Sequence, residues 1–584
     1  MGNVLIEPVD ILKVTGLMGK TTDAGGKSHR DELVLVALGG LGEIGMNAYL
    51  YGFGPPKARK WLLVDLGITF PEGEFDPGVD VILPDLRFLI EERHALVGIV
   101  LTHAHEDHIG AVIDLWPKLE APIYATPFTA GMLKAKAAEF GGRVKLPINV
   151  MPMGSRQNIG PFEIELVTMS HSIPEPSAIA IRTPAGLVLH SGDWKLDQTP
   201  YVGDPPNEAR LAEIGREGGR ALICDSTYAM REGRSPSELE IAQSLTEIVK
   251  KATKRVVVTS FSSNVARVKA VADAAVASGR TLVVAGRALH RVIEVARETG
   301  YLPVDLRYVD QQQFKYVNRN DVVLLCTGSQ GEPRAAMARI ADKEHPDIHL
   351  AKGDLVIFSS RTIPGNERSV GRIQNALVRM GCEVVTDAEA LVHVTGHPRR
   401  DELRQMYQWI KPQVAVPMHG EARHINAHAE LARAAGVPIV MPAYNGQMVR
   451  LSPDPVEIID DVPVGRLFRD GRLIVPSDSG PVRNRRKLAI VGMVVVAIAM
   501  TRKGEVLCDP EIALDGVPEF DADGDEMFDI AADAVDGTLD SMPAKKLKEV
   551  EVVREAVRRS VRAAVFEAWG KKPVVKVLIS VVDG

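Results

Sequence analysis

The feature that most constrains this chain is a histidine-rich hexapeptide that directly follows an apolar segment. Residues 97–102 (VGIVLT) predict a buried strand, the hexapeptide HAHEDH occupies 103–108, and a helical pattern follows at 111–119. Strand, polar loop and helix in this order are typical of α/β proteins, which place ligand-binding side chains at the carboxyl ends of strands. The sequence therefore predicts an α/β fold with a functional loop at 103–108.

Three imidazoles and a carboxylate in this loop favour a metal site. His103 and His105 point to the same side of an extended segment, and the turn into the helix brings Asp107 and His108 round as a second donor pair. Imidazole with carboxylate suits zinc, and the mixed nitrogen and oxygen set also admits manganese. A solvated polar loop is the alternative, but this spacing arises by chance in about one in a thousand such chains.

Further candidate ligands follow other predicted strands. His171 comes after FEIELVTM, Asp193 after LVLH and His419 after QVAVPM. A lone loop histidine is more often a surface residue than a ligand, but a shared position after strands brings such side chains to one edge of a sheet. Asp193 is a carboxylate and could bridge two ions. We therefore expect these three residues to join the loop at 103–108 in a two-ion site.

Composition limits the class of protein. The chain has 584 residues, which exceeds the size of one hydrophobic core, and its 45% apolar and 25% charged residues exclude wholesale disorder. The net charge of −7 indicates no general attraction to nucleic acid or membranes, so any such surface has to be local. Four cysteines without a CxxC pair fit a reducing cytosol. The longest apolar run, 488–500, is too short to span a bilayer and predicts a buried strand with its flanks.

The pattern of strands and helices divides the chain into units. Strands dominate from residue 31 to about 205, and from there strands, beginning with ALICDST, alternate with helices, which predicts a separate parallel α/β domain. The tail holds two apolar strands around an amphipathic helix. The N-terminus lacks a basic segment before a long apolar core, so it is not a signal peptide. The predicted boundaries are 1–30 for an extension, 31–205 and 396–480 for two parts of one domain, 206–395 for the inserted domain, and 481–584 for a linker and C-terminal domain.

Four other motifs favour a structural interpretation or stay open. GLGEIG at 40–45 matches GxGxxG, but a strand pattern follows it where a dinucleotide site needs a helix. DADGD at 521–525 lacks the glycine and glutamate that an EF-hand requires. His424 and His428 share a helix face without the acid of a zinc-protease motif, which favours a solvated face. The serines and Asn264 of SFSSN are equally consistent with a helix cap and a ligand pocket.

The order of the candidate residues resembles a known superfamily. HxHxDH followed by a lone histidine (His171) and a lone aspartate (Asp193), with Asp65 in LLVDLG, resembles the metallo-β-lactamase superfamily. Asp225 in ALICDSTY, His397 in HVTGHP and His419 in PMHGE resemble the β-CASP branch of that superfamily.

Two further segments narrow the resemblance. TGSQGEP at 327–333 and IPGNE at 363–367, with a C-terminal domain, make the chain similar to the ribonuclease J family, closely over 31–480 and more loosely beyond. This resemblance implies a metallo-β-lactamase αββα sandwich, interrupted by a β-CASP α/β domain and followed by a small α/β C-terminal domain.

The resemblance also implies a ligand set. It implies two Zn²⁺ ions per subunit, with Mn²⁺ or Mg²⁺ as alternatives. One ion would be held by His103, His105 and His171, and the other by Asp107, His108 and His419, with Asp193 bridging. Asp65 would support the ligands without being one. Ser191 stands where the family often has threonine, and serine keeps the hydroxyl.

Catalytic and substrate-binding residues follow from the same resemblance. His397 would protonate the departing 3′-oxygen, and Asp225 would hold the tautomer of His397 and raise its basicity; a structural histidine is the alternative. The HVTGH loop would bind the nucleotide and its 5′-monophosphate through His393, Val394, Thr395, Gly396 and His397, since its small residues let backbone N–H groups approach a phosphate.

The implied activity is that of a ribonuclease in RNA processing and decay. It comprises 5′→3′ exonuclease action that favours a 5′-monophosphate and endonuclease action, both leaving 5′-phosphate and 3′-hydroxyl ends. RNA is the implied partner, in a cytoplasmic homodimer or homotetramer without membrane attachment, which could associate with other RNA-decay proteins.

RNA binding has to be reconciled with the net negative charge. Residues 517–540 hold nine acids and no lysine or arginine, and without them the net charge of −7 would become +2. Five arginines near the matched loops could line an RNA channel, although each alone is consistent with an ordinary solvated side chain: Arg267, Arg287, Arg361, Arg399 and Arg400. Three alternative functions remain open: a DNA-cleaving β-CASP nuclease, a non-catalytic RNA-binding subunit, and a small ester or thioester hydrolase, which would leave Asp225 and His397 unused.

Overall fold

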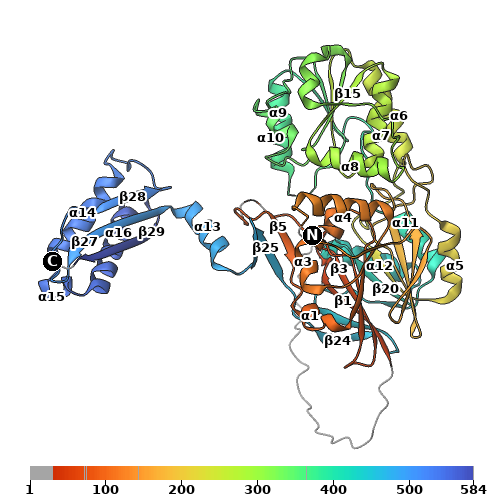
Figure 1. The fold of residues 1–584 in the computed structure, drawn as a ribbon, viewed down its shortest axis with the longest axis horizontal. Helices are drawn as coiled ribbons and strands as arrows, with labels where there is room; N and C mark the ends of the chain where they lie inside the picture. The colour runs from red at the N-terminus through yellow and green to blue at the C-terminus, as the bar shows by residue number, and fades with distance from the viewer. Residues whose placement is uncertain (1–30, 72, 74, 143, 364, 583–584) are drawn as a thin grey trace, which may run out of the picture.

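The computed structural model describes residues 31–71, 73, 75–142, 144–363 and 365–582, so the predicted N-terminal extension at 1–30 lies outside the described residues. Its central unit is a pair of facing sheets (Figure 1). The first sheet has eight strands in the order β24-β23-β1-β3-β4-β6-β7-β8. Their bounds are β1 (Glu32–Gly39), β3 (Ala48–Gly54), β4 (Lys60–Val64), β6 (Leu96–Val100), β7 (Ile123–Ala125), β8 (Ile148–Val150), β23 (Gln447–Ser452) and β24 (Glu457–Asp461).

The second sheet has seven strands in the order β22-β20-β13-β12-β11-β10-β9. Buried side chains from both sheets, such as Leu35, Leu62, Ile164 and Val416, share one hydrophobic core between the layers. The bounds of its strands are β9 (Arg156–Ile159), β10 (Phe162–Thr168), β11 (Ser177–Thr183), β12 (Gly186–His190), β13 (Gly219–Asp225), β20 (Val414–Met418) and β22 (Ile439–Val440).

Helices cover the outer faces of both sheets. Leu89, Leu115 and Phe128 pack with the first sheet, and Leu211 and Leu403 pack with the second. Covering both outer faces lets the strands be apolar on both sides, and the predicted αββα sandwich is confirmed. The helices are α1 (Arg87–Glu91), α3 (Val112–Leu119) and α4 (Pro127–Glu139) on the first sheet, and α5 (Glu208–Gly218), α11 (Arg400–Ile410) and α12 (Ala422–Ala434) on the second.

The inserted domain is a parallel six-stranded sheet with helices on both faces (green in Figure 1). Its strands are β14 (Val256–Thr259), β15 (Thr281–Ala285), β16 (Val309–Asp310), β17 (Val322–Cys326), β18 (Leu355–Phe358) and β19 (Glu383–Val385). Helices α6 (Glu238–Lys251), α7 (Val265–Ala277) and α8 (Arg287–Glu298) cover one face, and α9 (Ala336–Ala341) and α10 (Glu367–Arg379) cover the other.

One predicted boundary differs from the structure. The strand ALICDST was expected to begin the inserted domain at 206–395, but β13 pairs in parallel with β12 and with β20, so it is an internal strand of the sandwich. Consequently Asp225, at the end of β13, belongs to the same sheet edge as Asp193 and His419.

The C-terminal unit stands apart from the sandwich and is joined to it through α13 (Gly480–Val491) (Figure 1). The strand expected within 488–500 begins later than the apolar run does. Leu488 lies in α13, and the strand begins after Gly492, whose φ is 61°. The remaining elements are β27 (Met493–Thr501), β28 (Glu511–Asp515), α14 (Met527–Ser541), α15 (Ala544–Leu547), α16 (Val550–Trp569) and β29 (Val574–Val582). No helix among the described residues combines the length and apolarity needed to cross a membrane.

Short elements complete the sandwich. The GLGEIG segment forms a bend around β2 (Leu41–Gly42), which pairs with β21 (Gly420–Glu421), and β3 follows it as predicted, so no helix is available there for a dinucleotide. The helix α2 (Glu106–Ile109) and the 3₁₀ turn Arg93–Ala95 are also short. A separate three-stranded sheet consists of β5 (Val81–Pro84), β25 (Arg466–Asp470) and β26 (Leu473–Pro476), and the 3₁₀ turns Gln311–Tyr316 and Arg319–Asp321 belong to the inserted domain.

Candidate metal centre

The candidate ligands gather where several strands of the sandwich end. His103 and His105 follow β6, and Asp107 and His108 lie in the short helix α2. The other three come from loops after different strands: His171 after β10, Asp193 after β12 and His419 after β20. The structure brings all seven predicted ligands into one mostly buried cluster. They form two groups, and the donor atoms within each group lie within 4.8 Å of one another; a third group combines Asp193 and His419 with Asp225 and His397.

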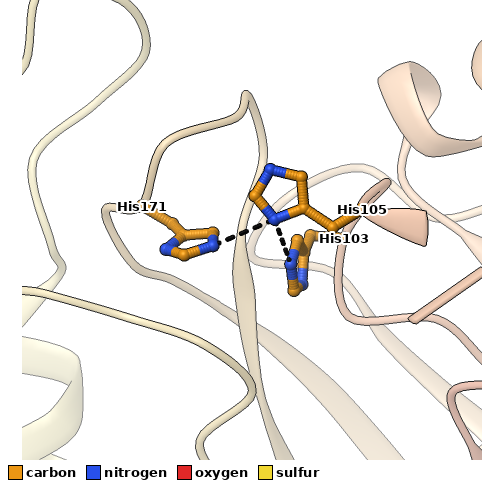
Figure 2. Close-up of side chains that lie close together, drawn as sticks. All are labelled: His103, His105 and His171. Atoms are coloured by element: carbon orange, nitrogen blue, oxygen red, sulfur yellow. Dashed lines mark hydrogen bonds between the residues drawn. The ribbon is translucent and has the colours of Figure 1, made fainter. Parts of the chain in front are cut away.

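The first group consists of three histidines whose nitrogens converge. Nδ1 of His105 lies 3.0 Å from Nε2 of His103 and 3.1 Å from Nε2 of His171 (Figure 2). Figure 2 shows His103 and His105 on one loop and His171 reaching in from another. Nδ1 of His171 donates to the carbonyl oxygen of Gly396 at 2.6 Å, so its Nε2 presents a lone pair.

The second group combines Asp107, His108, Asp193 and His419. Nε2 of His108 lies 3.2 Å from Oδ2 of Asp193, and Nε2 of His419 lies 3.2 Å from Oδ2 of Asp107. Oδ2 of Asp193 also lies 4.0 Å from Nε2 of His103 and 3.9 Å from Nε2 of His171. Asp193 therefore lies between the two groups.

Asp65 contacts one histidine of each group on the side of the ring away from the cluster, directly for His108 and through Thr102 for His103. Its Oδ2 accepts from Nδ1 of His108 at 2.7 Å and from the hydroxyl of Thr102 at 2.8 Å. Because that hydroxyl donates to Asp65, it accepts from Nδ1 of His103 at 3.0 Å. Asp65 thus sets the tautomers that leave Nε2 of both histidines free for an ion. Its φ of 61° is unusual for a residue other than glycine, as is the φ of 51° at His419.

Two residues with no sequence signal also hold this group. The amide nitrogen of Asn47 donates to the carbonyl oxygen of Asp107 at 3.1 Å and lies 3.1 Å from Nε2 of His108. The hydroxyl of Tyr49 lies 3.0 Å from Oδ1 of Asn47 and 3.1 Å from the carbonyl oxygen of Gly40, which accepts the N–H of His419 at 2.8 Å. Asn47, immediately before β3, and Tyr49 within β3 therefore connect candidate ligands that lie more than three hundred residues apart in the sequence.

The predicted acid and its partner are in contact. Nδ1 of His397 lies 2.7 Å from Oδ2 of Asp225. The hydroxyl of Ser191 accepts the N–H of Asp225 at 3.1 Å, which is a contact that threonine could also make. Thr227 donates to Oδ1 of Asp225 at 2.8 Å and faces Nδ1 of His419 at 2.8 Å. The pair of His397 and Asp225 is therefore linked through Thr227 to His419.

The HVTGH loop makes several contacts within the protein. Val394 is buried in the hydrophobic core, and the hydroxyl of Thr395 accepts the N–H of His397 at 3.2 Å. Gly396 approaches His171 so closely that a Cβ there would lie 2.4 Å from the imidazole. His393 is half-buried and its Nδ1 has no hydrogen-bond partner among the described side chains. Nucleotide binding by this loop stays a prediction.

The electrostatics of the two groups differ. Burial lowers the pKa of His103 and His171, and that of His105 to about 4, so the first group is neutral at pH 7. Burial also lowers the pKa of His108, but the carboxylates of Asp193, Asp107 and Asp65 outweigh this effect and raise it. In the same way neighbouring carboxylates, with Asp193 first, raise the pKa of His419 to about 10 against the effect of burial.

The carboxylates of the site stay ionised despite burial. Burial alone would raise the pKa of Asp107, Asp193 and Asp225, but the adjacent imidazoles hold each of these pKa values below the usual range. Burial likewise opposes protonation of His397, whereas Asp225 raises the pKa of that imidazole overall. The imidazoles and buried carboxylates of the second group thus stabilise one another's charged forms.

The residues present fit metal ions. In the first group the single Nδ1–H that His105 could supply cannot satisfy both Nε2 lone pairs that face it, so a cation suits the centre better than a proton. In the second, Oδ1 of Asp193 is buried without a hydrogen-bond partner in the described part of the chain. Imidazole and carboxylate donors suit Zn²⁺ and also Mn²⁺.

Several predictions outside the metal cluster need correction or stay open. Arg267 does not line a channel, because it is fully buried and binds Glu238 at 2.9 Å. His428 is buried and not solvated, with Ser226 and Tyr407 each 2.9 Å from its nitrogens. In SFSSN, the side chain of Asn264 caps α7.

Family models match most of the chain. The β-lactamase superfamily domain matches residues 75–215, the ribonuclease J β-CASP domain 253–377, the Zn-dependent metallo-hydrolase RNA specificity domain 381–442, and the ribonuclease J C-terminal domain 480–582. The matches agree with the predicted order of domains.

Curated relatives cover nearly the whole chain. A ribonuclease J from Sinorhizobium meliloti is 50% identical over 559 residues, which are 95% of this chain and 99% of the relative. Ribonuclease J from Corynebacterium glutamicum is 37% identical and covers 94% of this chain and 76% of the relative. Ribonuclease J from Mycobacterium tuberculosis is 36% identical and covers 93% of this chain and 96% of the relative.

Proposed function

The chain belongs to the ribonuclease J family of the metallo-β-lactamase superfamily, and from this premise we propose that it is a two-ion ribonuclease that removes nucleotides from the 5′ end of RNA and also cleaves internally. Its products carry 5′-phosphate and 3′-hydroxyl ends. A 5′-monophosphate is the favoured start, and the substrates are ribosomal RNA precursors and messenger RNA.

The observation that carries this proposal is the contact of 2.7 Å between His397 and Asp225 beside the ligand cluster. A hydrolase of small esters needs the metal ligands but has no use for this pair. A phosphodiester with a poor alkoxide leaving group needs a proton donor, and an imidazole whose pKa is raised by a carboxylate is suited to that task.

The ligand assignment proposed for this activity is the one that the geometry favours. His103, His105 and His171 would hold one Zn²⁺, Asp107, His108 and His419 the other, and Asp193 would touch both; Mn²⁺ and Mg²⁺ are alternatives. Two bound ions would lower the pKa of the attacking water and neutralise charge on the phosphate.

The protein's own groups orient the reaction. Asp225 accepts from Nδ1 of His397, which leaves Nε2 as the nitrogen of His397 that would protonate a departing 3′-oxygen. Thr227 links Asp225 to His419, so the proton donor and the second ligand group are fixed to one another. The HVTGH loop would position the terminal nucleotide next to His397. We further propose that the enzyme acts in the cytoplasm as a homodimer or homotetramer.

One assay tests the proposal against its alternatives. The purified protein is incubated with 5′-monophosphorylated RNA, 5′-triphosphorylated RNA and DNA oligomers, with Mn²⁺ and with chelator. We expect rapid mononucleotide release from the monophosphorylated RNA and none in chelator. Equal cleavage of DNA would instead favour a DNA-cleaving nuclease, and binding without products a non-catalytic subunit.

A pair of variants in one loop tests the ligand assignment. Asp107→Ala should lower the metal content, and full two-ion occupancy in that variant would refute its role. Glu106→Ala is the matched control, because the neighbouring carboxylate of Glu106 pairs with Lys136 and not with the ligand cluster. It should keep the metal content of the wild type.

A further inference from the structure

A series of flat side chains extends outward from the metal cluster. The ring of His397 is nearly parallel to that of His419, at 5.5 Å between centroids and 18° between planes. The ring of Tyr228 is in turn parallel to His397, at 6.2 Å and 3°. The guanidinium of Arg361 lies 5.7 Å from the centroid of Tyr228. These groups lead from a candidate ligand to a half-buried pair formed by Tyr228 and Arg361.

The two members of this pair come from different domains. Tyr228 follows β13 of the sandwich, whereas Arg361 follows β18 of the inserted domain. The backbone around Arg361 is fixed by Gln330, whose amide nitrogen donates to the carbonyl oxygen of Arg361 at 2.9 Å and whose Oε1 accepts the N–H of Ile363 at 2.8 Å. The backbone that carries Arg361 is therefore anchored to the inserted domain beside Tyr228.

Arg361 differs from Arg267 and Arg400 in having no acidic partner among the described residues. Arg267 binds Glu238 and Arg400 binds Glu232 at 2.6 Å, but Arg361 forms no ion pair within the part of the chain that the structure describes. Arg361 also belongs to the positive surroundings that, after burial, lower the pKa of His393. An unpaired guanidinium held against an aromatic ring still offers its edge to a phosphate.

We propose that Arg361 and Tyr228 form a nucleotide clamp for single-stranded RNA, in which Arg361 binds a backbone phosphate and Tyr228 supports the adjacent base. The inference rests on the proposed function, since it places the clamp beside the proton donor His397. Aromatic faces stack on bases of any identity, so we expect the clamp to bind RNA without sequence specificity. Because it spans two domains, bound RNA would also join the sandwich to the inserted domain.

Equilibrium binding measures the clamp separately from cleavage. The metal-loaded, full-length protein is titrated with single-stranded RNA in which a methylene replaces every bridging 3′-oxygen, so that the strand keeps its charge and resists hydrolysis. Arg361→Gln should raise Kd about tenfold and reduce the slope of log K against log salt by about 0.7, the value for one phosphate contact. Arg361→Lys should keep that slope and still weaken binding, because lysine cannot stack or bind bidentately.

Variants of Tyr228 and a distant arginine complete the test. Tyr228→Leu should weaken binding between about fivefold and a hundredfold, and Tyr228→Phe should bind like the wild type. Arg372→Gln is the control, since Arg372 is exposed on α10 and pairs with Asp342, and it should change neither Kd nor slope. An unchanged salt slope in Arg361→Gln would overturn the clamp even if RNA is cleaved, whereas normal clamp behaviour without cleavage of natural RNA would refute only the proposed function.

Discussion

Nδ1 of His171 lies 2.6 Å from the carbonyl oxygen of Gly396, so the residue next to the candidate acid also orients a candidate ligand. A side chain at 396 would collide with this imidazole, because a Cβ would lie 2.4 Å from both Cε1 and Nδ1 of His171. We predict that Gly396→Ala displaces His171 and weakens binding of one ion about 10- to 100-fold. Metal titration calorimetry measures the change.

The matched control for this variant is Gly371→Ala. Gly371 lies within α10, where a Cβ would meet no atom within 4 Å, so the substitution adds the same methyl group without contact. It should leave metal binding unchanged and favour the helix by about 1 kcal/mol. Wild-type metal affinity in Gly396→Ala would show that His171 does not depend on this contact or is not a ligand.

The hydroxyl of Tyr49 provides a second test of ligand positioning. It contacts Asn47, which holds the Asp107 and His108 segment, and Gly40, which holds the backbone of His419. Tyr49→Phe should therefore weaken the binding of one of the two ions about 10- to 100-fold, while the other ion stays bound. Metal content after dialysis against a graded series of chelator concentrations reports the two affinities.

Tyr51→Phe separates this effect from the loss of any buried hydroxyl. Tyr51 lies on the same strand and is fully buried, but its hydroxyl contacts Nδ1 of His190 at 2.9 Å, and His190 is not a candidate ligand. We expect Tyr51→Phe to keep both affinities. Equal metal loss in the two variants would indicate a general loosening of β3 and would contradict the specific role of Tyr49.

The proton donor can be distinguished from a ligand by comparing rate with metal content. Asp193, Asp225, His397 and His419 could also form a metal-binding group of their own. If His397 is the acid, His397→Ala should reduce turnover about 10²- to 10⁴-fold and keep both ions. Single-turnover cleavage gives the rate, and elemental analysis of the same sample gives the metal content. Loss of an ion together with activity would make His397 a ligand instead.

The sequence could predict the ligand loop because its donors are adjacent and follow a strand whose apolar character is evident. The same reasoning reached His171, Asp193 and His419 through their positions after strands, and the structure brings their side chains together. It could not reach Asn47, because an amide that follows a bend has no chemical signature of its own. The contact of Asn47 with Asp107 depends on a backbone approach between segments sixty residues apart.

The predicted start of the inserted domain at residue 206 was wrong for a related reason. The segment 219–225 is an apolar strand between two helices, which is consistent with either sheet. Its partner β20 lies almost two hundred residues further along the chain, so the choice of sheet is decided by a pairing that local pattern does not contain. At 488–500, apolar composition conceals the end of α13, which only the backbone at Gly492 reveals.

A buried ion pair in the inserted domain should make its stability depend on pH. Glu238 begins α6, is almost fully buried, and binds Arg267 of α7 at 2.9 Å with Lys195 of the sandwich 3.9 Å away. Burial would raise the pKa of Glu238, but Arg267 and Lys195 hold it below its usual value. Because the folded pKa is the lower one, the pair stabilises the fold above the unfolded pKa of about 4.3, and this contribution is lost as pH falls through the folded pKa.

Glu238→Gln isolates this contribution. At pH 7 the variant leaves Arg267 buried without a carboxylate, and we expect the free energy of unfolding to fall by about 3–5 kcal/mol. As the pH falls below about 4.3, the carboxyl of Glu238 takes up a proton in the unfolded chain before it does so in the folded protein, so the difference between the two proteins should shrink until the pH has passed the folded pKa. Calorimetric melting of both proteins at several pH values measures it, with Glu247→Gln on the exposed side of α6 as the control. A difference that stays constant from pH 7 into this acid range would mean that the charge of Glu238 does not stabilise the domain.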